Sequence, residues 1–291
     1  MTSPILLDGG PSTRGWHQIE AALRCPQLWA YQYKDRVIGP DGKPERPTAP
    51  ADALIRGTLV HVGAAHLFGT KAIQEGGLTW QGRRLTSVNE IYHPHDALRA
   101  MALDQGQWAE EWVKHLPTAT AMIDALYHEA IPLYYRAHVV AIEQEMRSTI
   151  GGELYTQRAD LIVEDADGGV WIDDVKTSAR AGAGAALKFA LSGQMLGYRW
   201  FGDNLWGSRF RGVRVILVQS TPPHKVERVT VPAAPFAAMH FERSVEWANE
   251  TIRRCAAMGL KANAYPKVLS EQGCITPYGR CSYFDACRFG G

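Results

Sequence analysis

The chain has little of what marks fibrous, secreted or membrane proteins. Its 291 residues include only five cysteines, an odd number that argues against a framework of disulfides. No hydrophobic run approaches the roughly 18 residues of a membrane span, and residues 1–15 combine neither a basic segment nor an apolar stretch. We therefore expect a soluble, cytoplasmic protein with no membrane partner.

Neither sign of charge dominates the chain. Lys and Arg number 31 and Asp and Glu number 30, so a nucleic-acid site would have to be a local basic patch. Hydrophobic residues make up 46% and charged residues 21%, which is typical of a globular protein and excludes disorder and coiled coil. The sequence also lacks the phosphate-binding motif Gly-x-x-x-x-Gly-Lys-Ser/Thr, so no helicase motor is expected.

The first part of the chain, residues 1–137, is predicted to be mainly helical. Apolar residues recur at helical spacing in 12–34, 51–68 and 98–137. We expect the first of these segments to break into two short helices at Cys25-Pro26, because proline interrupts a helix. Residues 35–52 are rich in Gly and Pro and read as a loop.

Residues 138–260 change to a strand-rich pattern. Runs rich in β-branched and apolar residues cover 138–148, 153–165, 168–178 and 212–220, with a helical segment at 185–201. The last of these runs is almost continuously apolar, which is typical of a strand buried on both faces. The order β-β-β-α-β, followed by a helix within 235–260 and a cysteine-rich tail at 261–291, predicts an α/β fold in one integrated domain.

Acidic residues fall inside three consecutive predicted strands. Glu143, Asp160 and Asp174 lie on the first, second and third strand, and Lys176 shares a face with Asp174 because strand side chains alternate. Converging carboxylates form a site suited to Mg²⁺ or Mn²⁺, and a lysine beside the cation can orient or deprotonate water. The alternative is a structural salt bridge of Asp173 and Asp174 with Lys176 at a strand end.

These motifs together resemble those of the PD-(D/E)XK nuclease superfamily, in particular its RecB-like exonuclease branch. The matching pieces follow the family's order over residues 56–198. They are RGTLVHVGAAH, AIEQE, RADLI, IDDVKTS and QMLGY. The resemblance implies a restriction-endonuclease-like fold, with a mixed β-sheet core flanked by helices and a helical N-terminal region.

The resemblance also implies roles for individual residues. It makes His61, Asp160 and Asp174 metal ligands, and it makes Lys176 catalytic together with the acidic residues. Glu143 is the preferred supporting carboxylate, although Glu145 lies on the same face of its strand.

The segment after the predicted catalytic lysine is implied to contact DNA. Gln194 and Tyr198 are four residues apart and therefore neighbours on a helix surface. Judged by spacing alone, an ordinary helix face that packs on the sheet explains them equally well. Arg180 is added as a DNA-binding residue because it is close to the motifs in sequence.

The cysteines gather at the two ends of the chain. Cys274, Cys281 and Cys287 crowd into the tail, and Cys25 is the candidate fourth ligand. Spacing alone allows a four-thiolate zinc site or a 4Fe-4S cluster. The layout is similar to that of RecB-like nucleases such as AddB and the CRISPR adaptation nucleases, which implies a 4Fe-4S cluster that ties the tail to the N-terminal region. Cys255 is expected to be a buried small hydrophobe.

The sequence thus predicts a divalent-metal-dependent DNA exonuclease that acts on single-stranded DNA or DNA ends. Its expected role is in recombination or repair, and a phage-encoded enzyme of this kind would fit that role. Its expected cofactors are Mg²⁺ or Mn²⁺ and the 4Fe-4S cluster, and its expected partners are DNA and a separate helicase or recombination protein. The alternative is a DNA end-binding or adaptor protein with weak or partner-dependent nuclease activity. An RNA nuclease also remains open at this point.

Overall fold

The chain divides into two compact units that interleave in sequence. The computed structural model describes residues 6, 14–34, 50–80, 83–179, 185–261, 264–267, 274–276, 279–281, 283–284 and 287. Unit 1 comprises Met1–Gly10, Asp52–Met146 and Arg158–Ala238, and unit 2 comprises Pro11–Ala51, Arg147–Gln157 and Met239–Gly291. The prediction that 1–137, 138–260 and 261–291 build one integrated domain stays a prediction.

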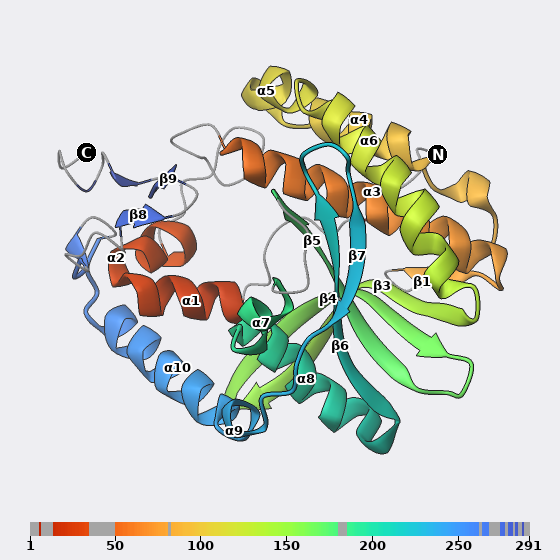
Figure 1. Cartoon of the computed structure of the whole chain (residues 1–291). Helices are drawn as coiled ribbons and strands as arrows, with labels where there is room; N and C mark the ends of the chain where they lie inside the picture. The colour runs from red at the N-terminus through yellow and green to blue at the C-terminus, as the bar shows by residue number, and fades with distance from the viewer. Residues whose placement is uncertain are drawn as a thin grey trace. The chain divides into compact units, whose positions relative to one another are not determined.

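A five-stranded mixed sheet in the order β3-β4-β5-β6-β7 forms the centre of unit 1 (Figure 1). Its strands are β3 (Ala137–Ile150), β4 (Glu153–Asp165), β5 (Val170–Ser178), β6 (Phe210–Gln219) and β7 (Val226–Thr230). β5 pairs antiparallel with β4 and parallel with β6, and β6 pairs antiparallel with β7. The apolar run 212–220 is confirmed as a strand buried on both faces. The sequence analysis did not predict β7.

Helices cover both faces of this sheet. The helices of unit 1 are α3 (Asp52–Gln74), α4 (Pro94–Leu103), α5 (Ala109–Val113), α6 (Leu116–Ala125), α7 (Ala185–Ala190) and α8 (Gly193–Trp206). Figure 1 shows α3, α4 and α6 on one side of the sheet and α8 on the other. A small hairpin of β1 (Leu78–Trp80) and β2 (Arg83–Leu85) follows α3. The predicted mixed sheet flanked by helices is therefore confirmed.

The main hydrophobic core lies between the sheet and the α3–α4–α6 side. α3 can approach its neighbours closely because residue 63 is glycine, and a Cβ at that position would lie 2.5 Å from Ile123 and 3.1 Å from Leu98. Val175 of β5 belongs to the same cluster of buried side chains as Phe68 of α3. This packing fixes α3 against β5, the strand that carries the predicted catalytic lysine.

Unit 2 holds the ends of the chain and the tip of the β3–β4 hairpin. Its helices are α1 (Trp16–Arg24), α2 (Pro26–Trp29) and α10 (Phe241–Ala257), and α9 (Pro235–Met239) ends in it. α1 ends directly before Cys25, so the predicted break at Cys25-Pro26 is confirmed. A small cluster of buried side chains that includes Trp29 and Tyr265 forms its own core. Two-residue strands β8 (Ile275–Thr276) and β9 (Gly279–Arg280) pair in the tail.

None of the described helices is long and apolar enough to cross a membrane.

A buried histidine makes unit 1 sensitive to acid. His66 of α3 is fully buried, accepts a hydrogen bond from the Leu6 amide at Nε2 (2.8 Å) and contacts the Tyr92 carbonyl through Nδ1 (2.9 Å). This arrangement requires a neutral ring. Burial lowers the pKa of His66 to about 4, against an ordinary value of 6.5.

We expect the free energy of unfolding to fall between pH 6.5 and pH 4. In this range His66 becomes protonated in the unfolded chain but stays neutral in the folded chain. The contribution is fully present above pH 6.5, and about 3 kcal/mol is lost by pH 4. Urea unfolding at several pH values measures the loss. His66→Gln, which keeps a donor and an acceptor but does not titrate, should flatten this part of the profile. An unchanged slope in His66→Gln would contradict the assignment.

Candidate active site

The third strand of the sheet presents a buried carboxylate and an amine side by side. Asp174 and Lys176 lie two residues apart on β5, and Lys176 Nζ is 2.5 Å from Asp174 Oδ2. Asp174 is completely buried, whereas the Lys176 side chain keeps about a quarter of its surface exposed (27%). The pair therefore consists of a fully buried carboxylate and a lysine side chain that is partly exposed.

Asp160 lies where β4 separates from β5. The register of the two strands ends at the pair Leu161–Asp173, so β4 supplies no further carbonyl to β5 beyond this point. The amide of Val175 donates instead to Asp160 Oδ2, at 2.7 Å. The carboxylate of Asp160 thus replaces a hydrogen bond of the sheet, which holds it beside Asp174.

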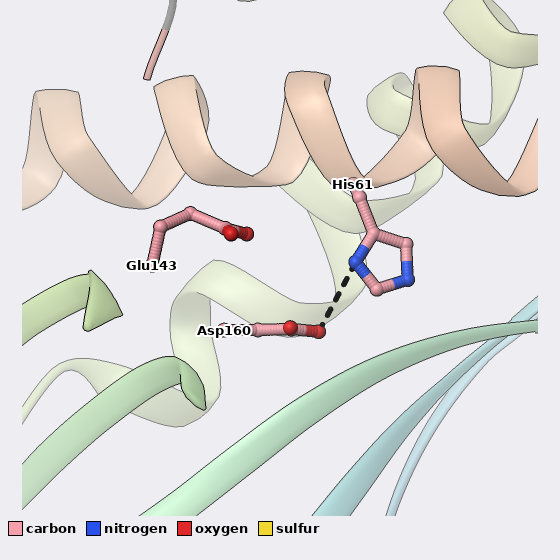
Figure 2. A group of neighbouring side chains, drawn as sticks. All are labelled: His61, Glu143 and Asp160. Carbon is pink, nitrogen blue, oxygen red and sulfur yellow. Dashed lines mark ion pairs between the residues drawn. The ribbon is translucent and has the colours of Figure 1, made fainter. Parts of the chain in front are cut away.

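His61 reaches the same place from α3. Its Nδ1 lies 3.2 Å from Asp160 Oδ2, and one ligand atom each of His61, Glu143 and Asp160 lies within 4.8 Å of the others (Figure 2). α3 passes close to the end of β5, since a Cβ added to Gly57 would lie 3.5 Å from Thr177 Oγ1. The structure therefore brings together a histidine from a helix and acidic residues from separate strands.

The two glutamates of β3 have different partners. Glu143 lies with His61 and Asp160, while Glu145 forms a 3.7 Å ion pair with Arg158. Glu143 has a φ of 49°, and no other described residue except glycine has a positive φ. Glu143 thus has a left-handed backbone conformation within the continuous strand β3. Glu143 is therefore the glutamate placed near the other candidate ligands.

Gln194 and Tyr198 of α8 hold the other oxygen of Asp174. Gln194 Nε2 donates to Asp174 Oδ1 (3.2 Å) and to the Tyr198 hydroxyl (3.0 Å). That hydroxyl lies 2.6 Å from the Arg158 carbonyl and 3.1 Å from Asp174 Oδ1. Tyr198 is fully buried, so the structure gives this pair a positioning role toward Asp174. Their contact with DNA stays a prediction, and Arg180 lies outside the described residues.

Charge and burial shift the pKa values of the β5 pair. Burial raises the pKa of Asp174, although Lys176 opposes the rise. Burial alone would lower the pKa of Lys176, but Asp174, Asp160 and Glu143 outweigh it, so the pKa of Lys176 is raised. As it stands, the site therefore holds an ammonium among carboxylates.

Asp173, the neighbour of Asp174, forms a buried ion pair in the interior of unit 1 and lies outside the candidate site. It points to the other face of β5, where Arg214 of β6 contacts both of its oxygens, Nε at 2.6 Å and Nη2 at 3.0 Å. The Tyr134 hydroxyl also donates to it, and the Arg214 guanidinium lies 4.5 Å from the centre of the Trp171 ring. Asp173 therefore forms a structural ion pair, but with Arg214 in the interior and not with Lys176 as the alternative had it.

The donor set fits a hard divalent cation. Carboxylate oxygens are the ligands that Mg²⁺ and Mn²⁺ prefer, and Glu143 and Asp160 offer them within a small volume, with the His61 imidazole beside them. The carboxylates outnumber the cationic groups here, so a bound cation would offset their mutual repulsion. The structure therefore supports a candidate metal site formed by His61, Glu143 and Asp160 and adjoining the Asp174–Lys176 pair.

All five cysteines belong to unit 2, and they lie farther apart than the candidate metal ligands of unit 1. The Cys281 amide donates to the Cys274 carbonyl (2.8 Å), and Cys25 and Cys281 pack against the same small core. Burial raises the pKa of the Cys281 and Cys287 thiols, and the other thiols of the group add to the rise. No three described cysteine sulfurs lie within 4.8 Å of one another. Cys255 is buried in that core, as predicted.

Sequence reasoning did not single out Arg158. Its carbonyl faces the Tyr198 hydroxyl and its side chain pairs with Glu145, so it links β3, β4 and α8 around the site. The available signal was its position two residues before Asp160, which places both side chains on the same face of a regular strand.

Fold and site together define an α/β protein with a candidate divalent-cation site at the point where two strands of a mixed sheet separate. The family model of the PD-(D/E)XK nuclease superfamily matches residues 16–288. The chain belongs to this superfamily.

No curated protein matches the chain. Among solved structures, a "putative exonuclease" from Eubacterium rectale is similar at 12% identity and a TM-score of 0.40, over 79% of this chain and 87% of that one. The crystal structure of a protein called SSO0001 is similar at 20% identity and a TM-score of 0.29, over 54% of this chain and 70% of that one.

Proposed function

We propose that the protein is a divalent-metal-dependent DNA exonuclease of the RecB-like branch, which hydrolyses phosphodiester bonds in single-stranded DNA or at DNA ends. The observation that carries the proposal is the convergence of His61, Glu143 and Asp160 next to the Asp174–Lys176 pair. Membership of a nuclease superfamily supports the same reading. The proposed role is recombination or repair, with a separate helicase or recombination protein as partner.

Each residue of the site has a separate proposed role. His61, Asp160 and Asp174, supported by Glu143, would hold the cation. A bound Mg²⁺ or Mn²⁺ supplies Lewis-acid stabilisation of the phosphoryl oxygens and makes water more acidic. The ammonium of Lys176, beside Asp174, can orient water and stabilise charge that develops on the phosphate. Gln194 and Tyr198 hold the Asp174 carboxylate in place from behind.

The test is digestion of end-labelled single-stranded DNA, duplex DNA and RNA with Mg²⁺, Mn²⁺ or EDTA. We expect metal-dependent shortening of DNA from an end, and loss of this activity in Lys176→Ala. The matched control is Lys225→Ala, since Lys225 is an exposed lysine of the same unit. Binding without cleavage in every metal would favour the end-binding or adaptor protein, and cleavage of RNA alone would overturn the choice of substrate.

We further propose that Cys25, Cys274, Cys281 and Cys287 hold a 4Fe-4S cluster. All four belong to unit 2, and the thiols of Cys281 and Cys287 are influenced electrostatically by the other members of the group. The spacing of the cysteines allows zinc as well as the cluster. The choice of the cluster follows the resemblance of the cysteine layout to that of RecB-like nucleases.

Replacement of Cys281 by alanine is expected to bleach the protein. The wild type, purified without oxygen, should be brown and contain iron, whereas Cys281→Ala should lose iron and unfold at lower urea concentration. The stability loss should be about 5 to 6 kcal/mol by the loop-closure model, because the cluster closes a loop of more than 200 residues between Cys25 and the tail. Cys255→Ala is the control and should keep its iron. A colourless wild type that carries zinc would refute the cluster.

A further inference from the structure

Lys267 connects two of the segments that carry the proposed cluster ligands. Its Nζ donates a hydrogen bond to the carbonyl of Cys287, at 2.9 Å. The residue before it, Pro266, accepts a hydrogen bond from the amide of Gln27 at 3.3 Å, and Gln27 follows Cys25 by two residues. Lys267 therefore lies between the Cys25 segment and the Cys287 segment, all within unit 2.

The three cysteines of the tail are joined to one another by the backbone. The Cys281 amide donates to the Cys274 carbonyl at 2.8 Å. The Cys281 carbonyl accepts from the Phe284 amide at 2.9 Å, and the Cys287 amide donates to the Tyr283 carbonyl at 2.9 Å. Replacement of a side chain elsewhere leaves these backbone bonds in place. The contact with Lys267 therefore connects a ready-formed group of three cysteines to the segment beside Cys25.

The segment that carries Lys267 is itself anchored. Tyr265 is buried, and its ring packs edge-on against Trp29 of α2, with 6.0 Å between the ring centres. A second contact joins the same parts of unit 2, because Tyr31 and Tyr283 stack with 4.7 Å between their ring centres. Loss of the exposed Lys267 side chain should therefore loosen the cysteine at the end of the hydrogen-bonded series without unfolding the unit.

The ammonium of Lys267 also acts on the Cys287 thiol through its charge. Burial and the neighbouring thiols raise the pKa of Cys287, and Lys267 opposes the rise. Thiolate is the ligand of 4Fe-4S clusters, and the reduction potential of a cluster depends on the net charge around it. A cation beside a thiolate-bound cluster favours the state that has one more electron, so it raises the potential.

We propose that Lys267 is a positioning residue of the cluster, which holds Cys287 beside the Cys25 segment through its hydrogen bond and raises the reduction potential through its charge. This inference rests on the proposed 4Fe-4S cluster and adds to it a residue that is not a ligand. Because the ammonium is exposed, water and salt screen its charge, so the change in potential should depend on ionic strength.

The test measures two properties of the brown protein purified without oxygen. One is the rate at which an iron chelator removes the colour, and the other is the reduction potential in a titration with dithionite. We expect Lys267→Met to lose iron about fivefold faster, the effect of losing one ordinary hydrogen bond, and to have a lower potential. Lys261→Met is the matched control at an exposed lysine of the same unit, and it should leave both values unchanged.

Two further measurements distinguish positioning from a general loosening of the fold. Lys267→Arg keeps a donor and the charge, so it should recover both the iron retention and the potential. A higher salt concentration should reduce the difference in potential between the wild type and Lys267→Met, because salt screens an exposed charge. If Lys267→Met takes up no iron at all while Lys267→Arg does, the positioning role is supported in a stronger form.

The outcomes that overturn the inference are distinct from those that overturn the cluster. If the wild type is brown and Lys267→Met matches it in both iron release and potential, the assignment of Lys267 is wrong while the cluster stands. A faster release with an unchanged potential would overturn the role of the charge. If the wild type is colourless and carries zinc, the proposed cluster fails first and the inference falls with it.

Discussion

Asp174→Asn is expected to abolish cleavage and to leave the fold intact. The substitution removes the buried negative charge of one of the proposed metal ligands, while the amide oxygen can still accept from Gln194 Nε2 and face the Tyr198 hydroxyl. Because burial already disfavours the charged carboxylate, the loss of that charge should change stability little. We expect at least a thousandfold fall in the rate of DNA shortening, similar to the loss of other groups that act at the reacting phosphate.

The measurement is the rate of digestion of end-labelled DNA under saturating Mg²⁺, together with a urea unfolding curve for each protein. A variant that keeps more than a tenth of the wild-type rate would show that Asp174 lies outside the chemistry. A variant that loses activity only because it unfolds would show a matching fall in the urea midpoint. The two measurements on the same protein sample therefore distinguish a loss of chemistry from a loss of folding.

Asp173→Asn should have the opposite effect, a large loss of stability. Asp173 and Arg214 are both buried, so removal of one charge leaves the Arg214 guanidinium in the interior without its counter-ion. A broken buried ion pair of this kind costs about 3 to 5 kcal/mol. Tyr134 loses a charged acceptor in the same change. We expect a lower urea midpoint for unfolding of unit 1, which contains all three residues.

The double replacement of Asp173 by asparagine and Arg214 by methionine is the control. It removes both charges, and the apolar side chain can pack against Trp171 where the guanidinium now lies. Most of the lost stability should return. A single variant as stable as the wild type would mean that the pair contributes nothing to the core.

Asp173 and Asp174 show which features of the site could be predicted from the sequence and which could not. The period-two pattern of β5 correctly separated Asp174 and Lys176 from Asp173, because alternation is a local property of a strand. It could not identify Arg214 as the partner of Asp173. That contact depends on the parallel register of β5 and β6, which are joined by a long connection whose geometry no local pattern contains.

The contacts of Asp160 could not be predicted from the sequence for a similar reason. The motif placed it near Asp174, but its hydrogen bond with the Val175 amide is possible because β4 pairs with β5 only from Leu161 onward. The start of strand pairing is a tertiary feature, and residues 153–165 read as one uninterrupted strand. In the same way, the choice between Glu143 and Glu145 depended on neighbours from other elements, which the pattern of apolar residues does not encode.

The left-handed backbone at Glu143 bears on how the site is prepared for its cation. For a residue with a Cβ this conformation costs roughly 1 to 2 kcal/mol, and only the surrounding sheet and helix can hold it in place. That conformational work is completed when the chain folds. The backbone that carries the carboxylate is therefore already in place before a cation arrives, and little backbone ordering entropy remains to oppose binding at this position.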